Sequence, residues 1–413
     1  MKKTILSAAA LLSVAAVFAQ QGIVNDYDFG DFKVHTYTSA EAMHDVSILV
    51  EGEKSLVVLE PQSFYKSIED FNAYAEKLGK PIEKIVANYH AGGLAECDLK
   101  KVVMVEPMAE FMKGEMAQGM MTKFAGAFQG AMDTRSVKIK KTIPAVGTQT
   151  WAGVEFDFVN GAASDFPASS VNIGGKVYYT HFAPDRGHLA PMRIKNSDSI
   201  DAILADLTGA KESGCEVFIG SHGSVATMED VEFMVSYLNT IKNLMAECSS
   251  SDLFAQRLIV AYPTLAVAEN VKAIAKALYP NEVVDSRKEA VKARVQDYFD
   301  MVSNLDADIA KNLWATTGDI SIITPRAQFF GAESIMNDFL IKTFSSMQSR
   351  KLHSLSEVVN IYGTSANVQL YWIFDTVDAA GEKHQTRGRE SLVFEEIAEE
   401  WKLVHVHYSR MPQ

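Results

Sequence analysis

Three histidines stand where short apolar runs end. His90, His181 and His222 each follow a stretch rich in Val, Ile, Phe or Tyr that predicts a β-strand. Neutral imidazoles are good zinc ligands, and three of them leave a fourth position for a water whose pKa the metal lowers to about 7. The set predicts either a mononuclear metal site for hydrolysis or three unrelated histidines hydrogen-bonded at strand ends.

A second group of polar side chains lies on the last predicted strand. Because side chains alternate between the faces of a strand, one face is predicted to carry Trp401, Leu403, His405, His407 and Ser409. Small-molecule pockets are largely apolar, with a few placed polar groups. We predict a ligand pocket lined by His405, His407, Ser409, Trp314, Tyr371, Trp372 and Arg389. Catalysis by the two histidines, or a polar strand end satisfied by neighbours and water, are the alternatives.

The elements that must position the first group alternate along the chain. The spacing of apolar residues predicts strands or β-rich stretches at 32–38, 45–50, 55–59, 84–87, 136–159, 170–180 and 216–219. It predicts helices at 63–78, 200–211 and 228–248. Strands and helices interleave in this way when helices cover the outer faces of a sheet.

From about residue 280 the order of elements changes. Residues 286–310 predict a helix, and the strands predicted after it cover 320–323, 355–362, 368–375, 391–395 and 401–408. Helix first and a meander of strands later is an α+β plan. We place the border between two domains near residues 280–287, so that they comprise residues 20–280 and 281–413.

The first domain resembles the metallo-β-lactamase-fold superfamily. Residues 85–93 (IVANYHAGG) are similar to the family's strand that runs into T-H-x-H-x-D-H. Residues 161–165 (GAASD) are similar to its G-A-H-T-x-D segment, and residues 218–223 (FIGSHG) to its late P-G-H-G turn. An apolar run that ends at Glu60 also falls at a matching place. The resemblance implies an αββα sandwich.

The family's ligand set is depleted in this chain. In the matching register His90 and His222 are retained, and His181 lies at or next to the position of the bridging aspartate. The ligand positions that are lost carry Asn88, Gly92, Gly93 and Ala163. The resemblance therefore implies a scaffold with an eroded metal site and no cofactor. The alternative is a mononuclear zinc hydrolase acting on an ester, thioester or lactam through His90, His181 and His222.

The second domain resembles the SnoaL-like, or nuclear-transport-factor-like, cone fold. The resemblance rests on residues 313–315 (LWA), 324–325 (TP), 331–335 (GAESI) and the ending at 401–412, which reads W-x-x-x-H-x-H-x-S. It implies an α+β cone that binds a small molecule or forms a homodimer, since some relatives are isomerases or cyclases and others only bind or associate. Fold alone does not choose among these.

The N-terminus and the composition bear on location and partners. Lys2 and Lys3 precede an uncharged apolar run at 4–18 and a cleavage site between Ala19 and Gln20, which is typical of a secretory signal peptide. We expect a periplasmic or secreted bacterial protein with no stable membrane anchor; an uncleaved anchor is the alternative. A net charge of −13 argues against nucleic acid as a partner.

Sulfur-containing residues leave two questions open. The cysteines Cys97, Cys215 and Cys248 are either buried apolar residues or include one disulfide, whose pairing the spacing does not determine. Methionines recur every four residues from Met104 to Met120, which predicts one helix face. An apolar lid or an oligomer contact is the favoured interpretation, with Cu(I) binding as the alternative.

Overall fold

The structure is a computed structural model that describes residues 22–162, 166–223, 225–316 and 318–411. The predicted signal peptide lies outside the described residues, as do Ala163 and Asp165 of the second motif. The chain divides into two compact units. One contains the residues up to Asp185 together with Asp201–Ser236, and the other contains Arg186–Ile200 together with the chain from Tyr237 onward.

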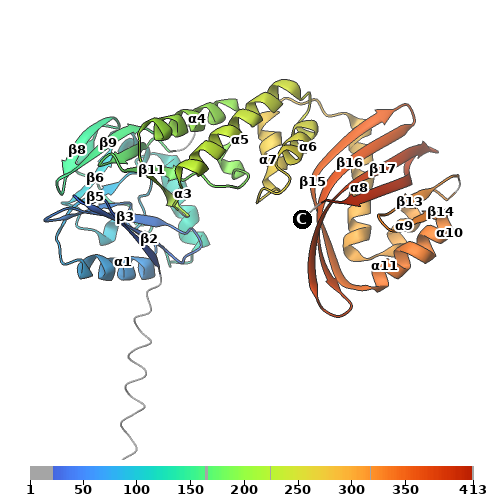
Figure 1. Ribbon diagram of the computed structural model, residues 1–413, viewed down its shortest axis with the longest axis horizontal. Coiled ribbons are helices and arrows are strands. Elements are labelled where there is room, and N and C mark those ends of the chain that lie inside the picture. Colours follow the sequence, from blue (N-terminus) through green and yellow to red (C-terminus); the bar gives the residue numbers. More distant parts are fainter. Residues whose placement is uncertain (1–21, 163–165, 224, 317, 412–413) are drawn as a thin grey trace, which may run out of the picture. The chain divides into compact units, whose positions relative to one another are not determined.

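Two mixed sheets make up the first unit (Figure 1). The first has the order β1-β2-β3-β4-β5-β6-β7, antiparallel up to β4 and parallel from there on. Its strands are β1 (Ile23–Asp28), β2 (Lys33–Thr38), β3 (Val46–Glu51), β4 (Leu56–Leu59), β5 (Ile82–Ala87), β6 (Val102–Val105) and β7 (Thr142–Ile143).

The second sheet has the order β12-β11-β10-β9-β8, in which only the β11–β12 pair is parallel. Its strands are β8 (Gly147–Trp151), β9 (Val154–Asn160), β10 (Ser169–Ile173), β11 (Val177–Phe182) and β12 (Val217–His222). The two sheets share one core, in which Phe156 and Phe158 of β9 are buried together with Ile48 and Val50 of β3. They therefore pack face to face.

Helices lie on the outer faces of these sheets. The Tyr37 hydroxyl on β2 donates a 2.8 Å hydrogen bond to Asp70 of α1 (Tyr65–Lys77). On the second sheet, the hydroxyls of Ser170, Tyr178 and Thr180 all donate to the carboxylate of Asp206 in α4 (Ser197–Glu212). These bonds fix one helix to each sheet.

The remaining helices of this part of the chain range from single turns to a long helix. They are η1 (Leu94–Glu96), α2 (Glu106–Phe111), α3 (Glu115–Ala127), η2 (Pro191–Arg193) and the long α5 (Met228–Glu247). The predicted methionine face is wrong, because the run crosses three elements. Met104 is buried in β6, Met108 is buried in α2, and Met116 is exposed on α3.

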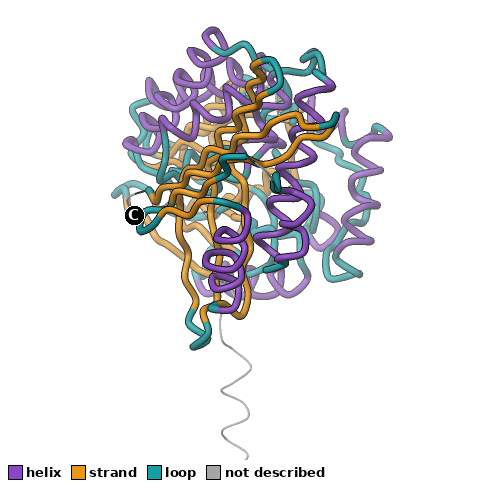
Figure 2. The backbone as a smooth tube through the Cα atoms, turned by 90° about the vertical axis from the view of Figure 1, so that its right-hand side faces the viewer, coloured by secondary structure: helices purple, strands orange, loops and turns teal. Residues whose placement is uncertain are grey.

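In the second unit a six-stranded sheet curves around a long helix, α8 (Ser286–Asn304), as Figures 1 and 2 show. The strand order is β14-β13-β18-β17-β16-β15. The strands are β13 (Ser321–Ile323), β14 (Gln328–Phe330), β15 (Met347–Tyr362), β16 (Ser365–Asp378), β17 (Lys383–Ile397) and β18 (Glu400–Arg410). The helices are α6 (Ser251–Ala261), α7 (Asn270–Leu278), α9 (Ala307–Leu313), α10 (Ala332–Ser334), the π-helical η3 (Ile335–Leu340) and α11 (Ile341–Ser345).

Apolar spacing placed α8 correctly against this sheet. Val291, Val295, Phe299 and Val302 recur at helical spacing, and all four are buried. The Asp285 carboxylate accepts from the first backbone N–H groups of the helix, which fixes its start. The predicted single helix over 286–310 is wrong at its end, where the backbone turns left-handed and α9 begins separately.

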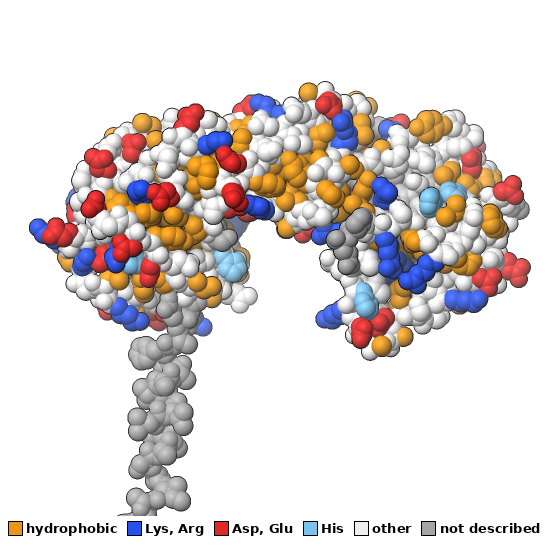
Figure 3. Space-filling model, viewed as in Figure 1, with side chains coloured by type: hydrophobic (Ala, Val, Ile, Leu, Met, Phe, Trp, Pro, Cys, Tyr) orange, Lys and Arg blue, Asp and Glu red, His pale blue; other side chains and the backbone are white. Residues whose placement is uncertain are grey.

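Further differences from the sequence-based elements are local. Residues 136–141, predicted within a β-rich stretch, have no regular structure, and β1, α6 and α7 were not predicted. All three cysteines are free thiols. Acidic and basic side chains are mixed over the face drawn in Figure 3. Among the described residues, no helix is both long and apolar enough to cross a bilayer.

Candidate functional site

The fold brings the three predicted histidines together. His90 follows the end of β5, His181 lies near the end of β11, and His222 ends β12. Because β11 and β12 are parallel, their carboxyl ends meet at one edge of the second sheet, where ligands commonly bind in such sheets. One ring nitrogen from each histidine lies within 4.8 Å of the other two.

A buried glutamate holds the loop that carries His90. Glu60, at the end of β4, accepts hydrogen bonds from the backbone N–H of Tyr89 (2.7 Å) and of His90 (3.0 Å), and from the Tyr179 hydroxyl (2.6 Å). Burial raises the pKa of Glu60 to about 7, although these hydrogen bonds oppose the shift. Glu60, the acidic residue that the sequence places at the end of an apolar run, thus holds the loop in place through hydrogen bonds.

His222 is oriented from behind. Its Nδ1 lies 3.0 Å from the Met43 carbonyl oxygen and 3.2 Å from Asp45 Oδ1. Burial alone would raise the pKa of Asp45, but the adjacent His222 imidazole holds that pKa below its ordinary value. A carbonyl or carboxylate behind an imidazole fixes the ring and leaves its other nitrogen free to bind a metal.

The nitrogen that faces inward is close to the next histidine. His222 Nε2 lies 3.0 Å from His90 Nε2, and two ligands of a tetrahedral zinc ion at 2.0–2.1 Å would lie roughly 3.3 Å apart. Burial lowers the pKa of His90 to about 3, so its ring is neutral. His90 Nδ1 is buried with no hydrogen-bond partner in the described part of the chain. This donor set fits one zinc ion.

The lost ligand positions are occupied by other contacts. A Cβ on Gly93, which has φ +76°, would lie 1.9 Å from the Gln62 carbonyl oxygen, and one on Gly92 would lie 2.6 Å from Ser63 Oγ. The buried Asn88 side chain exchanges two hydrogen bonds with the backbone of Ser169 in β10. An aspartate or histidine at Gly93 would require the backbone to move, and one at Gly92 would have to displace the Ser63 side chain.

Aromatic rings surround the histidines. His181 stacks on Tyr89 with centroids 4.6 Å apart, and the rings of Phe166 and Phe182 lie 5.3 and 4.1 Å from it. A group bound here would therefore meet apolar walls on the His181 side.

The predicted pocket of the second unit is organised differently from the expectation. In β18, Val404 has no partner opposite it, because His405 pairs with Val393 and Leu403 pairs with Phe394. This bulge shifts the alternation by one residue. Trp401 and Leu403 therefore face the core with Val406, whereas His405 and the exposed His407 face outward.

Most of the other predicted lining residues are likewise divided between the outer face of the sheet and the core. Arg389 pairs with Tyr371 and donates a 3.2 Å hydrogen bond to Ser409 on the outer face, so these three residues do not line the interior. Trp314 and Trp372 are buried in the core. The predicted common face is wrong for Trp401 and Leu403, which face the core, whereas His405, His407 and Ser409 do share the outer face. The bulge that separates the two groups is not visible in the sequence.

The interior holds a small cavity of about 30 Å³ with polar groups in its wall. The Tyr298 hydroxyl donates a 2.5 Å hydrogen bond to the buried Glu390, and burial raises the pKa of Glu390 to about 7. The Arg350 guanidinium lies 3.6 Å from the centre of the Phe374 ring. Trp314 Nε1 and Arg350 Nε are buried and have no hydrogen-bond partner among the residues described.

Sequence reasoning missed the polar residues of this cavity. Glu390 lies two residues before Leu392 and four before Phe394, and both of these are buried. Glu390 directly precedes the predicted strand at 391–395, so extending its period-two spacing by one residue would have given a signal for a buried carboxylate. Arg350 gave none, since it lies five residues before the strand predicted at 355–362.

One comparison with known proteins identifies a domain within the second unit. Residues 291–413 match the family model for a SnoaL-like domain, and they form a SnoaL-like, NTF2-like domain. A search of the curated proteins found no match.

Three solved structures illustrate the likeness. A nuclear transport factor 2 (NTF2-like) superfamily protein from Salmonella enterica is 28% identical over 30% of this chain and 92% of its own, with a TM-score of 0.30. The association domain of CaMKII from C. elegans is 24% identical (30% and 95% covered, TM-score 0.26). A cystatin-like-fold protein from Caulobacter vibrioides is 18% identical (30% and 89% covered, TM-score 0.28).

Proposed function

We propose that the SnoaL-like domain binds a small molecule inside its cone. The observation that carries the proposal is the pair of buried donors, Trp314 Nε1 and Arg350 Nε, that have no partner in the described structure and belong to residues lining the same cavity. An unpaired buried donor costs roughly 1–3 kcal/mol, which an acceptor on a ligand would recover.

The chemistry of the wall defines the ligand class. The indole N–H of Trp314 and the cationic guanidinium of Arg350 are both donors, so they favour a ligand with a carbonyl or carboxylate group. The surrounding Phe339, Phe344 and Phe374 favour a ligand with an apolar or aromatic body. The cavity holds about one water, so the ligand must displace the π-helical η3, whose residues form one wall. Short π-helical turns are frequent at functional sites.

The test uses benzoate, phenylacetate and 2-naphthoate as probes on the full chain, with ligand-observed NMR as the readout. Trp314→Phe keeps the ring but removes the N–H, and we expect it to weaken binding of the preferred carboxylate roughly tenfold. His407→Ala, on the outer face, is the matched control and should bind as the wild type does. Failure of all three probes at millimolar concentration, or equal affinity in Trp314→Phe, would refute this assignment.

A second candidate function is supported by the histidine cluster. We propose that the first unit is a metallo-β-lactamase-like αββα sandwich, which its two packed sheets and outer helices support, with a depleted but usable metal site. His90, His181 and His222 would hold one zinc ion, which supplies a bound water of lowered pKa for hydrolysis of an ester, thioester or lactam. Asp45 and the Met43 carbonyl would orient His222.

Elemental analysis of the purified chain tests the metal site. We expect near-stoichiometric zinc in the wild type, loss of zinc in His222→Ala, and retention in His353→Ala, which changes a histidine on β15 of the second unit. Zinc at background in the wild type would leave the first unit as a non-catalytic scaffold. We also propose that the protein is exported to the periplasm and that it forms a homodimer through the second unit. Both proposals are tested below.

A further inference from the structure

Lysines gather at one edge of the first sheet. The strands β5, β6 and β7 are parallel, so all three begin at this edge, and lysines lie at or just before the start of each. The segment 136–141, which leads into β7, contributes half of them. We call the following six residues the lysine edge: Lys84, Lys100, Lys101, Lys138, Lys140 and Lys141.

Backbone pairing makes these lysines neighbours in space. The backbone N–H of Ile85 donates a 3.1 Å hydrogen bond to the Lys101 carbonyl, which joins β5 to the start of β6. The backbone N–H of Met104 donates a 3.3 Å bond to the Lys141 carbonyl, which joins β6 to the start of β7. The Lys141 ammonium group also donates a 3.1 Å bond to the Lys100 carbonyl. Since paired strands lie about 4.8 Å apart, three separate segments bring their lysines together.

The segment 136–141 is held in place by its apolar residues. Val137 and Ile139 are partly buried and pack against the core of the first unit. Lys138 and Lys140 alternate with them and are exposed, as is Lys141. Core contacts therefore fix the backbone, and the charged groups remain in solvent.

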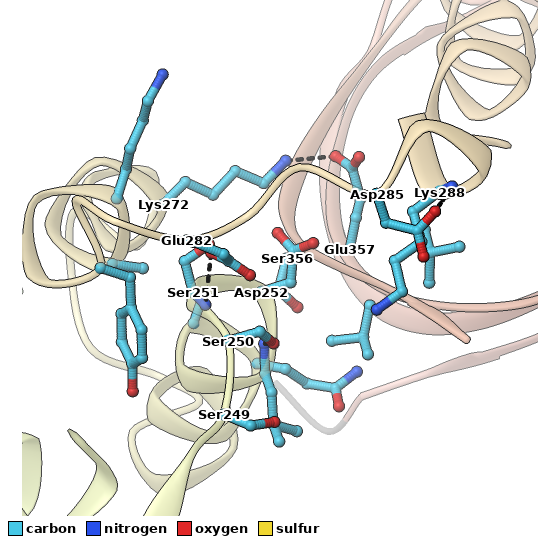
Figure 4. Close-up of a pocket in the computed structure, with 18 of the residues that line it drawn as sticks. Ser249, Ser250, Ser251, Asp252, Lys272, Glu282, Asp285, Lys288, Ser356 and Glu357 are labelled. Atoms are coloured by element: carbon cyan, nitrogen blue, oxygen red, sulfur yellow. Dashed lines mark hydrogen bonds and ion pairs between the residues drawn. The ribbon is translucent and has the colours of Figure 1, made fainter. Parts of the chain in front are cut away.

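The charge of the lysine edge is not compensated locally. No carboxylate of the described residues forms an ion pair with any of its six ammonium groups, in contrast to Lys272, which Figure 4 shows paired with Glu357 in the second unit. The acidic residues nearest in sequence have other partners. Asp98 accepts from the backbone N–H of Lys100, and Glu83 accepts from a serine hydroxyl and a backbone N–H. Like charges held side by side repel one another, and a negatively charged partner would relieve this repulsion.

The composition of the lysine edge indicates the kind of partner. Residues 82–87, 98–105 and 136–143 contain no arginine and no aromatic residue. Arginine is the residue that grips single phosphates in a bidentate manner, and aromatic rings stack on the bases of single-stranded nucleic acids. Lysine is a hydrated point charge, and each lysine near an anionic bilayer contributes about 1 kcal/mol of attraction. We propose that the lysine edge binds reversibly to a bilayer surface that contains anionic phospholipids.

Cosedimentation with lipid vesicles tests the proposal. The sample is residues 20–413, which contain every described element and lack the apolar run at 4–18 that could itself insert. We expect binding to phosphatidylcholine vesicles that contain about 30% phosphatidylglycerol, and no binding to phosphatidylcholine alone. Binding at about 50 mM NaCl should be lost at about 500 mM, because salt screens the attraction. The triple variant Lys138→Gln, Lys140→Gln, Lys141→Gln should bind more weakly, by roughly fivefold for each lysine.

A second triple variant is the matched control. Lys66→Gln, Lys276→Gln and Lys383→Gln remove the same charge from exposed lysines on α1, α7 and β17, and should weaken binding far less. All six substituted lysines are exposed, so both variants should unfold at temperatures near that of the wild type. Equal weakening in the two variants would show an effect of net charge alone and overturn the proposal. Absence of binding to the anionic vesicles at low salt, or binding of a single-stranded oligonucleotide in their place, would overturn it as well.

Discussion

Two glutamates in this protein are buried in the same manner. Glu60 and Glu390 each have a pKa raised to about 7 by burial, and each accepts a hydrogen bond from a tyrosine hydroxyl. Their surroundings differ, because Glu60 also accepts backbone N–H groups whereas Glu390 faces a cavity that contains Arg350. Glu60 therefore holds a loop in place, whereas Glu390 lies in the wall of a cavity.

Replacement of Glu390 by glutamine tests its burial. With a folded pKa of about 7 against 4.5 in the unfolded chain, stability falls as pH rises through this window, because the folded protein must then bury an ionised carboxylate. The amide stays neutral. We expect Glu390→Gln to gain stability over the wild type between pH 5 and pH 8, by up to roughly 3 kcal/mol, in thermal unfolding.

The partly exposed Glu395 on the same strand provides the control for this series. Glu395→Gln should show a smaller change of its stability difference with pH. A constant difference between Glu390→Gln and the wild type from pH 5 to pH 8 would mean that Glu390 does not titrate in this range.

At the level of elements, short irregularities decide which residues reach a site. In the loop after β5, Gly93 adopts φ +76° against the Gln62 carbonyl. In β18, the unpaired Val404 turns two histidines outward. In both places a single residue changes which side chains can converge.

The Gly93 environment can be tested against a glycine of similar backbone. Gly79 has φ +69°, but a Cβ there would meet nothing within 4 Å. Gly79→Ala should lose roughly 1 kcal/mol of stability from backbone strain alone. Gly93→Ala should lose more, since its Cβ clashes with backbone. Equal losses in urea unfolding would show that the loop can relax and could accept the family's missing ligand.

The bulge in β18 predicts that aspartate substitutions at two nearby valines lose very different amounts of stability. Strict alternation would place Val404 and Val406 on one face, but Val406 is 1% exposed and Val404 is only partly buried. Val406→Asp should unfold the domain, because it buries an unpaired charge. Val404→Asp should lose less than roughly 1 kcal/mol. Similar losses in thermal unfolding of the two variants would contradict the bulge.

At the scale of the whole chain, export and association are separate questions. The N-terminal pattern predicts cleavage before Gln20, and the three cysteines are free thiols in the folded protein.

Mass spectrometry of the chain expressed with its N-terminus and recovered from the periplasm tests export. We expect a mature protein that begins at Gln20, and light scattering of the same sample should give the mass of a homodimer. A full-length protein retained in the membrane fraction would contradict cleavage, and a monomer at micromolar concentration would contradict self-association.

The sequence by itself determined the order of most elements, the cone domain and the histidines that converge, because apolar periodicity and terminal motifs depend on local chemistry. It did not reveal the bulge at Val404 or the partners of Glu60. It also gave no sign that Arg350 lines the cavity of the cone. Those features depend on which strands pair and in which register, and contacts between residues far apart in sequence set that register only when the chain is folded.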